Sequence, residues 1–253
     1  MLTCSLQSGS NGNCIYVEAG DVRLLFDAGI SGRQVQQRLG VHQRSPRGCT
    51  ALIISHDHGD HSACAGALHR RFGMPVYMAP RVWRAVRNNV GPIPDLHLYS
   101  PGNTLTFGDV SVHTIPTPHD GIDTACFVIE HEKRRLGIFT DLGHPFAELS
   151  QALGEIDAAY LESNFDVDML WNGQYPEAIK RRIAGDGGHL SNADAAALMG
   201  KALSREVRWL ALAHLSAENN TPELALETGR RGVGRLLELH IASRYEASDL
   251  RSV

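Results

Sequence analysis

The chain has 253 residues, of which 43% are hydrophobic, 21% are charged and 6% are aromatic. This composition is ordinary for a folded globular protein and excludes collagen-like, disordered and coiled-coil classes. Lysine and arginine number 24 against 28 aspartates and glutamates, a formal net charge of −4. The chain lacks the basic excess of many nucleic-acid-binding domains, although a local basic patch or bound cations still allow a polyanionic substrate.

The first half of the sequence predicts a β-meander followed by alternating helices and strands. Apolar runs separated by turn residues predict strands at residues 2–6, 14–18 and 22–26. Beyond them the pattern predicts helices at 31–39, 62–72 and 80–89, and strands at 51–55, 75–79, 104–107, 110–116, 124–131 and 135–140.

The second half continues this alternation. It predicts helices at 145–153, 176–184, 191–204 and 222–239, and strands at 157–162 and 207–213. Two strand-rich halves, each accompanied by helices, predict an α/β (α+β) protein: an αββα sandwich of two mixed β-sheets flanked by helices. Because no linker or repeat interrupts the pattern, we expect a single domain over residues 1–253.

The cysteines and the N-terminal residues bear on the compartment. The five cysteines show no C-x-x-C spacing and lie mostly beside apolar residues, which indicates reduced thiols used for packing. The first residues carry no basic segment before an apolar run, and no apolar run approaches the ~20 residues of a membrane span. We therefore expect a cytoplasmic protein without a membrane partner.

The strongest chemical signal is the segment 56–61, His-Asp-His-Gly-Asp-His, directly after the predicted strand 51–55. His56 and His58 are two residues apart, so on an extended chain both imidazoles point to one side and reach one ion. Asp60 and His61, beyond the flexible Gly59, can turn toward a second ion. A polar surface loop is the alternative, but four nitrogen and oxygen ligands within six residues favour a metal site.

Three further candidate ligands, His119, Asp141 and His214, each follow an apolar strand, and strand ends converge at one edge of a sandwich. Asp141 is the candidate bridge, because a carboxylate has two oxygens and can hold ions about 3.5–4 Å apart. The seven ligands predict two divalent ions per chain, zinc or alternatively manganese. A metal-bridging hydroxide is the expected nucleophile, since one zinc ion already lowers the pKa of its bound water to about 7.

The spacing of these ligands resembles that of the metallo-β-lactamase superfamily, and within it the YycJ/WalJ (VicX) type. The resemblance spans nearly the whole chain and rests on segments 8–13, 26–31, 55–61, 140–143, 162–164, 175–176, 179–183, 188–192 and 212–220. Two positions depart from the pattern: Gln7, where glycine or alanine usually opens the first loop, and Phe165, where histidine is frequent.

The resemblance implies a dinuclear metal-dependent phosphodiesterase, expected to be a 5′-to-3′ DNA exonuclease, in which Asp27 is a structural aspartate that braces the metal loop. The candidate catalytic residues are Asp60, Glu162 and His189. His189 precedes a predicted helix, whose N-terminal amides suit an anion, and RNase Z-like relatives carry such a histidine in the matching segment. We expect His189 to protonate the leaving oxygen and Glu162 to orient it; the alternatives are a residue of the helix-capping region and a buried structural carboxylate.

Polar and basic residues near this site are candidates for binding the substrate, which is expected to be DNA. The loop 8–13 can present amides and hydroxyls to a phosphate, and the basic face of helix 176–184 can follow a nucleic-acid backbone. A plain β-turn and a solvated helix face are the alternatives. The candidates are Ser8, Ser10, Asn11, Asn13, Lys180, Arg181, Ser191, Asn192, Ser216 and Asn219.

Other functions fit the same ligands. A hydrolase of a small substrate, such as a cyclic phosphodiester or a thioester, and an RNA-processing nuclease of the same fold would both use this metal core. A non-catalytic module is disfavoured because all seven ligands are present. A β-CASP-type nuclease requires a domain-sized insertion, whereas only 73 positions separate Asp141 from His214.

Overall fold

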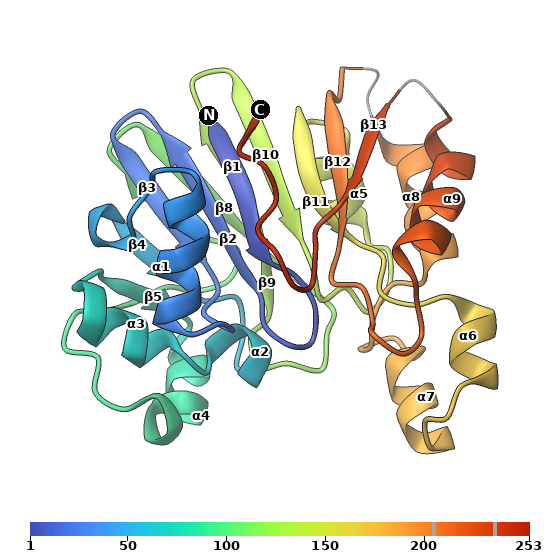
Figure 1. The fold of residues 1–253 in the computed structure, drawn as a ribbon, viewed down its shortest axis with the longest axis horizontal. Helices are drawn as coiled ribbons and strands as arrows, with labels where there is room; N and C mark the ends of the chain where they lie inside the picture. Colours follow the sequence, from blue (N-terminus) through green and yellow to red (C-terminus); the bar gives the residue numbers. More distant parts are fainter. Residues whose placement is uncertain (204–205, 235–236) are drawn as a thin grey trace.

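Two seven-stranded sheets pack face to face in the computed structural model of the chain, which describes residues 1–203, 206–234 and 237–253 (Figure 1). The first sheet has the order β14 (Arg251–Ser252), β1 (Leu2–Gln7), β2 (Cys14–Ala19), β3 (Val22–Phe26), β4 (Ala51–Ile53), β5 (Val76–Met78) and β6 (Leu96–Leu98). The second has the order β13 (Glu238–Ile241), β12 (Trp209–Ala213), β11 (Ala158–Glu162), β10 (Arg134–Phe139), β9 (Ala125–His131), β8 (Val110–Pro116) and β7 (Thr104–Phe107).

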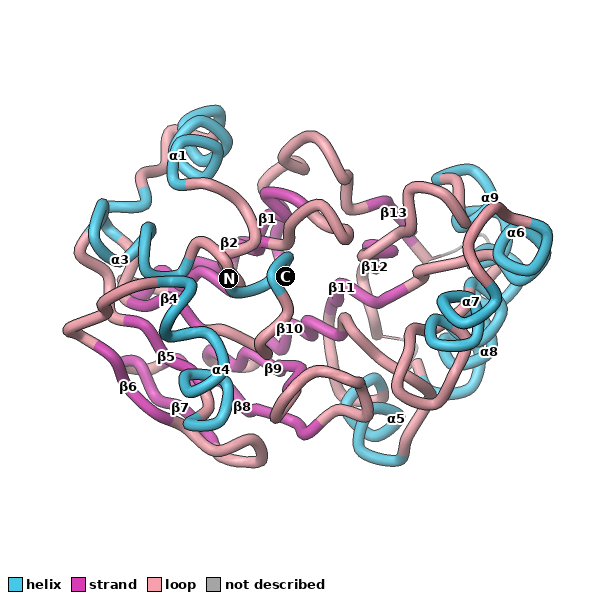
Figure 2. The backbone as a smooth tube through the Cα atoms, turned by 90° about the horizontal axis from the view of Figure 1, so that it is seen from below, coloured by secondary structure: helices cyan, strands magenta, loops and turns pink. Residues whose placement is uncertain are grey.

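Helices cover the outer sides of both sheets, as Figure 2 shows from below. Those beside the first sheet are α1 (Gly32–Val41), α3 (Ala65–Phe72) and α4 (Pro80–Val90); those beside the second are α5 (Ala147–Leu153), α8 (Asn192–Ala202) and α9 (Pro222–Val233). The shorter elements are η1 (Pro46–Gly48), α2 (Gly59–Ser62), α6 (Val167–Asn172) and α7 (Glu177–Ile183). The predicted αββα sandwich of two mixed sheets is confirmed.

The alternation of side chains along the strands produces three apolar layers. In β3, Leu24 and Phe26 face the second sheet, whereas Leu25 faces the helices that cover the first. In β10, Leu136 and Ile138 join the layer between the sheets, and Phe139 packs among residues of α5 and α8. Strands buried on both faces explain the nearly continuous apolar runs of the sequence.

The direction of the strands brings the candidate ligands to one edge. Strands β10, β11 and β12 are parallel, and β8 runs in the same direction because both β8 and β10 are antiparallel to β9. In the first sheet β3 and β4 are parallel as well. Their carboxyl ends therefore gather ligand-bearing loops, as in other sheets with parallel strands.

Several predicted boundaries were wrong. The helix predicted at 222–239 ends at Val233, because Gly234 takes a left-handed conformation (φ +74°) and its N–H caps the carbonyl of Arg230. Residues 238–239 instead begin strand β13; residues 235–236 of that predicted helix, and residue 204 of the helix predicted at 191–204, lie outside the described residues. The predicted helix 62–72 is divided between α2 and α3, and β6, α6, β13 and β14 were not predicted.

The five cysteines are free thiols, and four of them, Cys4, Cys14, Cys49 and Cys126, are buried. Their burial agrees with the packing role predicted from the sequence. Over the described residues, no helix is long and apolar enough to cross a membrane.

Candidate metal centre

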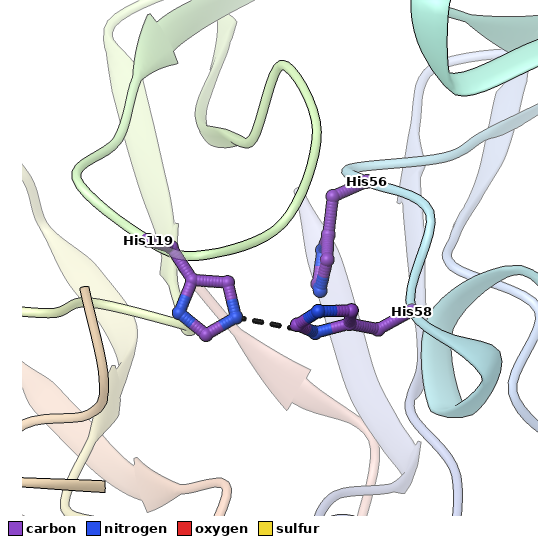
Figure 3. A group of neighbouring side chains, drawn as sticks. All are labelled: His56, His58 and His119. Atoms are coloured by element: carbon purple, nitrogen blue, oxygen red, sulfur yellow. Dashed lines mark hydrogen bonds between the residues drawn. The ribbon is translucent and has the colours of Figure 1, made fainter. Parts of the chain in front are cut away.

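Three histidines from two loops lie together at the edge where the parallel strands end (Figure 3). His56 and His58 come from the segment that leaves β4, and His119 comes from the loop after β8. Each offers a ring nitrogen, and these three atoms all lie within 4.8 Å of one another. Nε2 of His119 is 3.3 Å from Nδ1 of His58, so the sequence segments predicted to share an ion are brought together.

A second group consists of Asp60, His61 and His214. Oδ2 of Asp60 is 3.6 Å from Nε2 of His61 and 3.4 Å from Nε2 of His214. His61 and His214 are completely or almost completely buried, and Asp60 is partly exposed. This group is open to solvent through the carboxylate of Asp60.

Asp141 lies between the two groups. Its Oδ2 is 3.2 Å from Nε2 of His61, and its Oδ1 is 3.7 Å from Nε2 of His119. It forms a third group of possible ligands with His56 and His61. The two oxygens of one carboxylate thus face both sets of histidines, as the bridging hypothesis requires.

The chemistry of these atoms fits divalent cations. Nε2 of His56 and Oδ2 of Asp141 are buried and have no hydrogen-bond partner, which is costly unless another group binds them. Burial and the neighbouring histidines lower the pKa of His56. Burial raises the pKa of Asp141, but His214 and His61 outweigh it, so that pKa lies below its usual value. Neutral imidazole and ionised carboxylate are the forms that bind metal ions.

Hydrogen bonds fix the orientation of the rings. The Ser55 hydroxyl donates to Asp27 (3.0 Å), so Nδ1 of His56 donates to the Ser55 oxygen (2.9 Å) and leaves Nε2 as an acceptor. Asp27 also accepts from Nδ1 of His61 at 2.7 Å, and the carbonyl of Gly188 accepts from Nδ1 of His119 at 2.9 Å. Partners of this kind hold ligating histidines in one tautomer and one orientation.

Three residues of the site have a left-handed backbone conformation that is uncommon outside glycine. Asp27, Asp141 and His214 have φ values of +66°, +60° and +56°, and each follows the last residues of a strand: β3, β10 and β12. Such conformations cost free energy and persist where the surrounding structure enforces them, often at functional sites. Here the side chains of Asp141 and His214 approach each other to 3.5 Å, and Asp27 contacts the candidate ligand His61.

Glu162, at the end of β11, is completely buried and accepts four hydrogen bonds. Oε1 accepts from Nδ1 of both His189 and His214 at 2.9 Å, and Oε2 accepts from the backbone N–H groups of Leu142 and Leu190. Burial raises the pKa of Glu162, but His189 and His214 more than compensate and hold it below its usual value. An ionised Glu162 therefore orients one candidate ligand and the candidate general acid.

The comparisons with known proteins agree with this geometry. Residues 8–214 match the metallo-β-lactamase superfamily. The chain belongs to this superfamily. It is 35% identical to exodeoxyribonuclease YycJ of Bacillus anthracis over 244 residues, which cover 93% of this chain and 92% of that protein. It is 34% identical to exodeoxyribonuclease WalJ of Streptococcus pneumoniae over 224 residues, which cover 87% and 83% of the two chains.

A solved structure shows the same fold. The metallo-β-lactamase fold protein YhfI from Bacillus subtilis superposes with a TM-score of 0.74 and 17% identity, covering 98% of this chain and 100% of that one. The resemblance inferred from the sequence is confirmed, and the chain is a hydrolase of the metallo-β-lactamase superfamily. The His/Asp groups described above are its candidate sites for divalent ions.

Ser8 and Asn13, at the two ends of the loop between β1 and β2, form hydrogen bonds within the chain. The buried Ser8 hydroxyl accepts from the N–H of His214 at 2.8 Å. The Asn13 amide exchanges hydrogen bonds with the backbone of Gly9 and lies 2.9 Å from Nε2 of His61. Both were predicted to contact substrate, which stays a prediction; in the structure their hydrogen bonds reach the candidate ligands His214 and His61.

Three other predicted substrate contacts are also buried and bonded within the chain. Lys180 is 9% exposed, and its ammonium donates to the carbonyl of Trp171, which ties α7 to α6. Ser191 is buried as the N-cap of α8. Asn192 is buried and paired with Asn220. None of these groups faces solvent, because packing between elements has taken up their hydrogen bonds.

The remaining predicted substrate contacts differ in exposure. Ser10, Asn11 and Arg181 are exposed. Ser216 is partly exposed, and its hydroxyl accepts from the N–H of Asn219, which is itself buried. The first three are exposed, although Asn11 donates to the carbonyl of Arg244 and Arg181 pairs with Glu177.

The sequence did not predict Asp120 as a residue of the site or Arg182 as its partner, although Arg182 lies on the basic helix face predicted to follow a nucleic-acid backbone. Oδ1 of Asp120 is 3.4 Å from Nε2 of His58 and 3.5 Å from Nε2 of His119. The guanidinium of Arg182, on α7, donates two hydrogen bonds to the Asp120 carboxylate. The position of Asp120 immediately after His119 was the available signal; the approach of Arg182 depends on how α7 packs and has no signal in the sequence.

The two departures from the family pattern are structural. Gln7 is buried and donates from Nε2 to the carbonyl of Asn11, so it holds the loop between β1 and β2. Phe165 is buried and forms a β-bridge with Ser191. Neither lies among the candidate metal ligands.

Proposed function

We propose that the protein is a dinuclear metal-dependent phosphodiesterase that degrades DNA from 5′ ends. The observation that carries this proposal is the Asp141 carboxylate, whose two oxygens face two histidine groups with His189 beside them. The exodeoxyribonucleases of Bacillus anthracis and Streptococcus pneumoniae, which match most of the chain, support DNA as the substrate.

The candidate ligands divide into two sets that share Asp141. His56, His58 and His119 form one set, and Asp60, His61 and His214 form the other. Two divalent ions held there, zinc or alternatively manganese, would supply a hydroxide nucleophile near neutral pH and neutralise the phosphate oxygens. The ions also explain how a chain with a net charge of −4 binds a polyanion.

His189 supplies the proton to the leaving oxygen. Its Nδ1 donates to Glu162, so Nε2 is the ring nitrogen available to the substrate, and the side chain is 15% exposed. The hydrogen bond to Glu162 fixes the tautomer and the orientation of the His189 ring. His189 is therefore the catalytic acid and Glu162 the positioning residue, while Ser10, Asn11 and Arg181 remain candidates for contacts to the nucleic-acid backbone.

Free, mostly buried thiols suit a reducing compartment, so we place this activity in the cytoplasm. The alternative functions, an RNA-processing nuclease and a hydrolase of small phosphodiesters, would use the same residues.

The test uses metal-reconstituted protein with single- and double-stranded DNA, RNA and bis(p-nitrophenyl) phosphate. Parallel DNA substrates carry a label at the 5′ or the 3′ end, with 5′-phosphate and 5′-hydroxyl forms compared. We expect early release of the 5′ label as a short product and gradual shortening of the 3′-labelled strand. Loss of the 3′ label first would exclude 5′-to-3′ polarity, and cleavage of RNA alone would exclude DNA as the substrate. Asp141→Ala is the control for contaminating nuclease.

A further inference from the structure

A cavity of about 260 Å³ is lined by Leu215, the residue that follows the candidate metal ligand His214. One wall comes from residues 215–222, which follow β12. The other comes from residues 241–245, at and after the end of β13. Most of the lining residues are apolar, and Arg244 is the single charged residue among the described residues that line it. Figure 1 shows the latter segment, in red, beside the blue loop between β1 and β2.

The Arg244 guanidinium lines this cavity and contacts the residue that follows the candidate ligand His214. Its Nη1 donates to the carbonyl of Leu215, the residue after His214, at 2.6 Å, and is 3.5 Å from the Ser10 hydroxyl. Its Nε is buried and has no hydrogen-bond partner. Arg244 thus places a positive charge on the wall of the cavity, beside Leu215 and next to two exposed residues of the loop 8–13, Ser10 and Asn11.

Tyr245 offers an exposed aromatic ring on a fixed backbone. Its side chain is 70% exposed. Its N–H donates to the Ser243 hydroxyl at 3.1 Å, and its carbonyl accepts from the Arg38 guanidinium at 2.6 Å. Because the backbone is held on both sides, the ring is a positioned surface at the mouth of the cavity and not part of a loose end.

We propose that this cavity binds one unpaired nucleobase of the substrate, which stacks on Tyr245, while Arg244 binds the phosphate of the same nucleotide. The proposal rests on the function proposed above and names the subsite next to the scissile phosphodiester. Aromatic rings bind bases of any sequence by stacking, and guanidinium groups bind phosphate oxygens through paired hydrogen bonds. An apolar ligand would not use Arg244, and a free phosphate would not use the apolar walls or the ring.

The test measures binding and hydrolysis separately. The variants are Tyr245→Ala, Tyr245→Phe and Arg244→Gln, with the exposed Leu98→Ala and Arg84→Gln as matched controls. Binding is followed in metal-free protein with chelator, by the fluorescence of a single-stranded oligodeoxynucleotide that carries 2-aminopurine near its 5′ end. Hydrolysis is followed with metal-loaded protein on the same strand and on bis(p-nitrophenyl) phosphate.

We expect quenching of 2-aminopurine by the unmodified protein and by Tyr245→Phe, and on the order of tenfold weaker binding by Tyr245→Ala. KM for single-stranded DNA should rise by a similar factor, with kcat/KM for the aryl phosphodiester unchanged. Arg244→Gln should make the slope of log binding constant against log salt shallower by about 0.7, the value for one phosphate contact on a single strand.

Unchanged DNA binding by Tyr245→Ala and Arg244→Gln would overturn the subsite, as would equal losses on both substrates, which would indicate a structural role. Failure of the proposed function has a different result: the unmodified protein would hydrolyse bis(p-nitrophenyl) phosphate but not DNA.

Discussion

His189 donates a hydrogen bond from Nδ1 to Oε1 of Glu162, at 2.9 Å. The same oxygen accepts from Nδ1 of His214, so one buried carboxylate orients both a candidate metal ligand and the candidate acid. The arrangement leaves Nε2 of each imidazole directed away from Glu162. Binding of metal and transfer of a proton therefore depend on a shared group but use different histidines.

Replacing His189 by alanine should separate these two roles. We expect His189→Ala to retain both metals, because this residue is not needed by either ligand set, and to slow hydrolysis of DNA on the order of 10²–10⁴-fold. The loss should be much smaller on bis(p-nitrophenyl) phosphate, since p-nitrophenolate departs without being protonated. The measurement is kcat on both substrates together with metal content by elemental analysis.

Equal losses on the two substrates with metal content unchanged would mean that His189 holds the phosphate. A change below about threefold on both substrates would indicate a structural role for His189 at the N-terminus of α8.

Glu162→Gln should affect both roles at once. Glu162 accepts four hydrogen bonds. In glutamine one carboxylate oxygen is replaced by an NH₂ group, which is a donor and cannot accept hydrogen bonds from the N–H groups that face it. We expect a stability loss of about 1–3 kcal/mol and roughly 10–100-fold weaker metal binding through His214. Thermal unfolding and competition with a chelator measure these effects. The exposed Glu148→Gln is the control, and unchanged metal affinity would show that His214 does not need this acceptor.

The metal centre could be predicted because its chemistry is local in the sequence. His56, His58 and His61 lie within six residues after a buried strand, and strand direction brings Asp141 and His214 to the same edge. Neither inference requires knowledge of side-chain packing.

The burial of some predicted substrate residues could not be inferred from the sequence, because it depends on neighbours distant in the chain. Lys180 looks like part of a basic helix face but reaches the carbonyl of Trp171, and Asn192 is paired with Asn220. Strand β13 was missed for a similar reason: its pairing with β12 prevails over a helical pattern that continues past Gly234.

Asp141→Ala tests the bridge directly. We expect the variant to lose at least one of two ions and to have no detectable phosphodiesterase activity, because the shared ligand of both sets is removed. Elemental analysis of the purified variant decides this, with the exposed Asp95→Ala as the control. Two ions retained per chain would exclude a bridging role for Asp141.

Acid stability should depend on an ion pair remote from the site. Both oxygens of Glu18 accept from the Arg44 guanidinium at 2.7 Å, and these hydrogen bonds lower the pKa of Glu18 in the folded chain. A lowered folded pKa stabilises the protein above the unfolded value near 4.3, and this stabilisation is lost as the pH falls through the folded pKa. Glu18→Gln should therefore lower Tm at pH 7 and differ less from the unmodified protein at pH 3.

The control for this comparison is Glu227→Gln, which removes an exposed i,i+4 pair with Arg231 and should change Tm little at either pH. A Tm difference for Glu18→Gln that grows toward low pH would have the wrong sign and would refute the assignment.

The close approach of Gly29 to the metal loop predicts the effect of a single methyl group. A Cβ atom at Gly29 would lie 1.7 Å from the carbonyl oxygen of Asp60 and 2.5 Å from the backbone nitrogen of Asn13, so the backbone that carries Asp60 would have to move. We expect Gly29→Ala to cost about 1–3 kcal/mol of stability and to reduce metal content. Gly40, in α1, has no atom within 4 Å of its would-be Cβ, so Gly40→Ala should be neutral or stabilise the helix by about 0.5–1 kcal/mol. Thermal unfolding and elemental analysis of the pair separate the two effects. If both variants bound two ions and unfolded like the unmodified protein, contact with Gly29 would not be what positions Asp60.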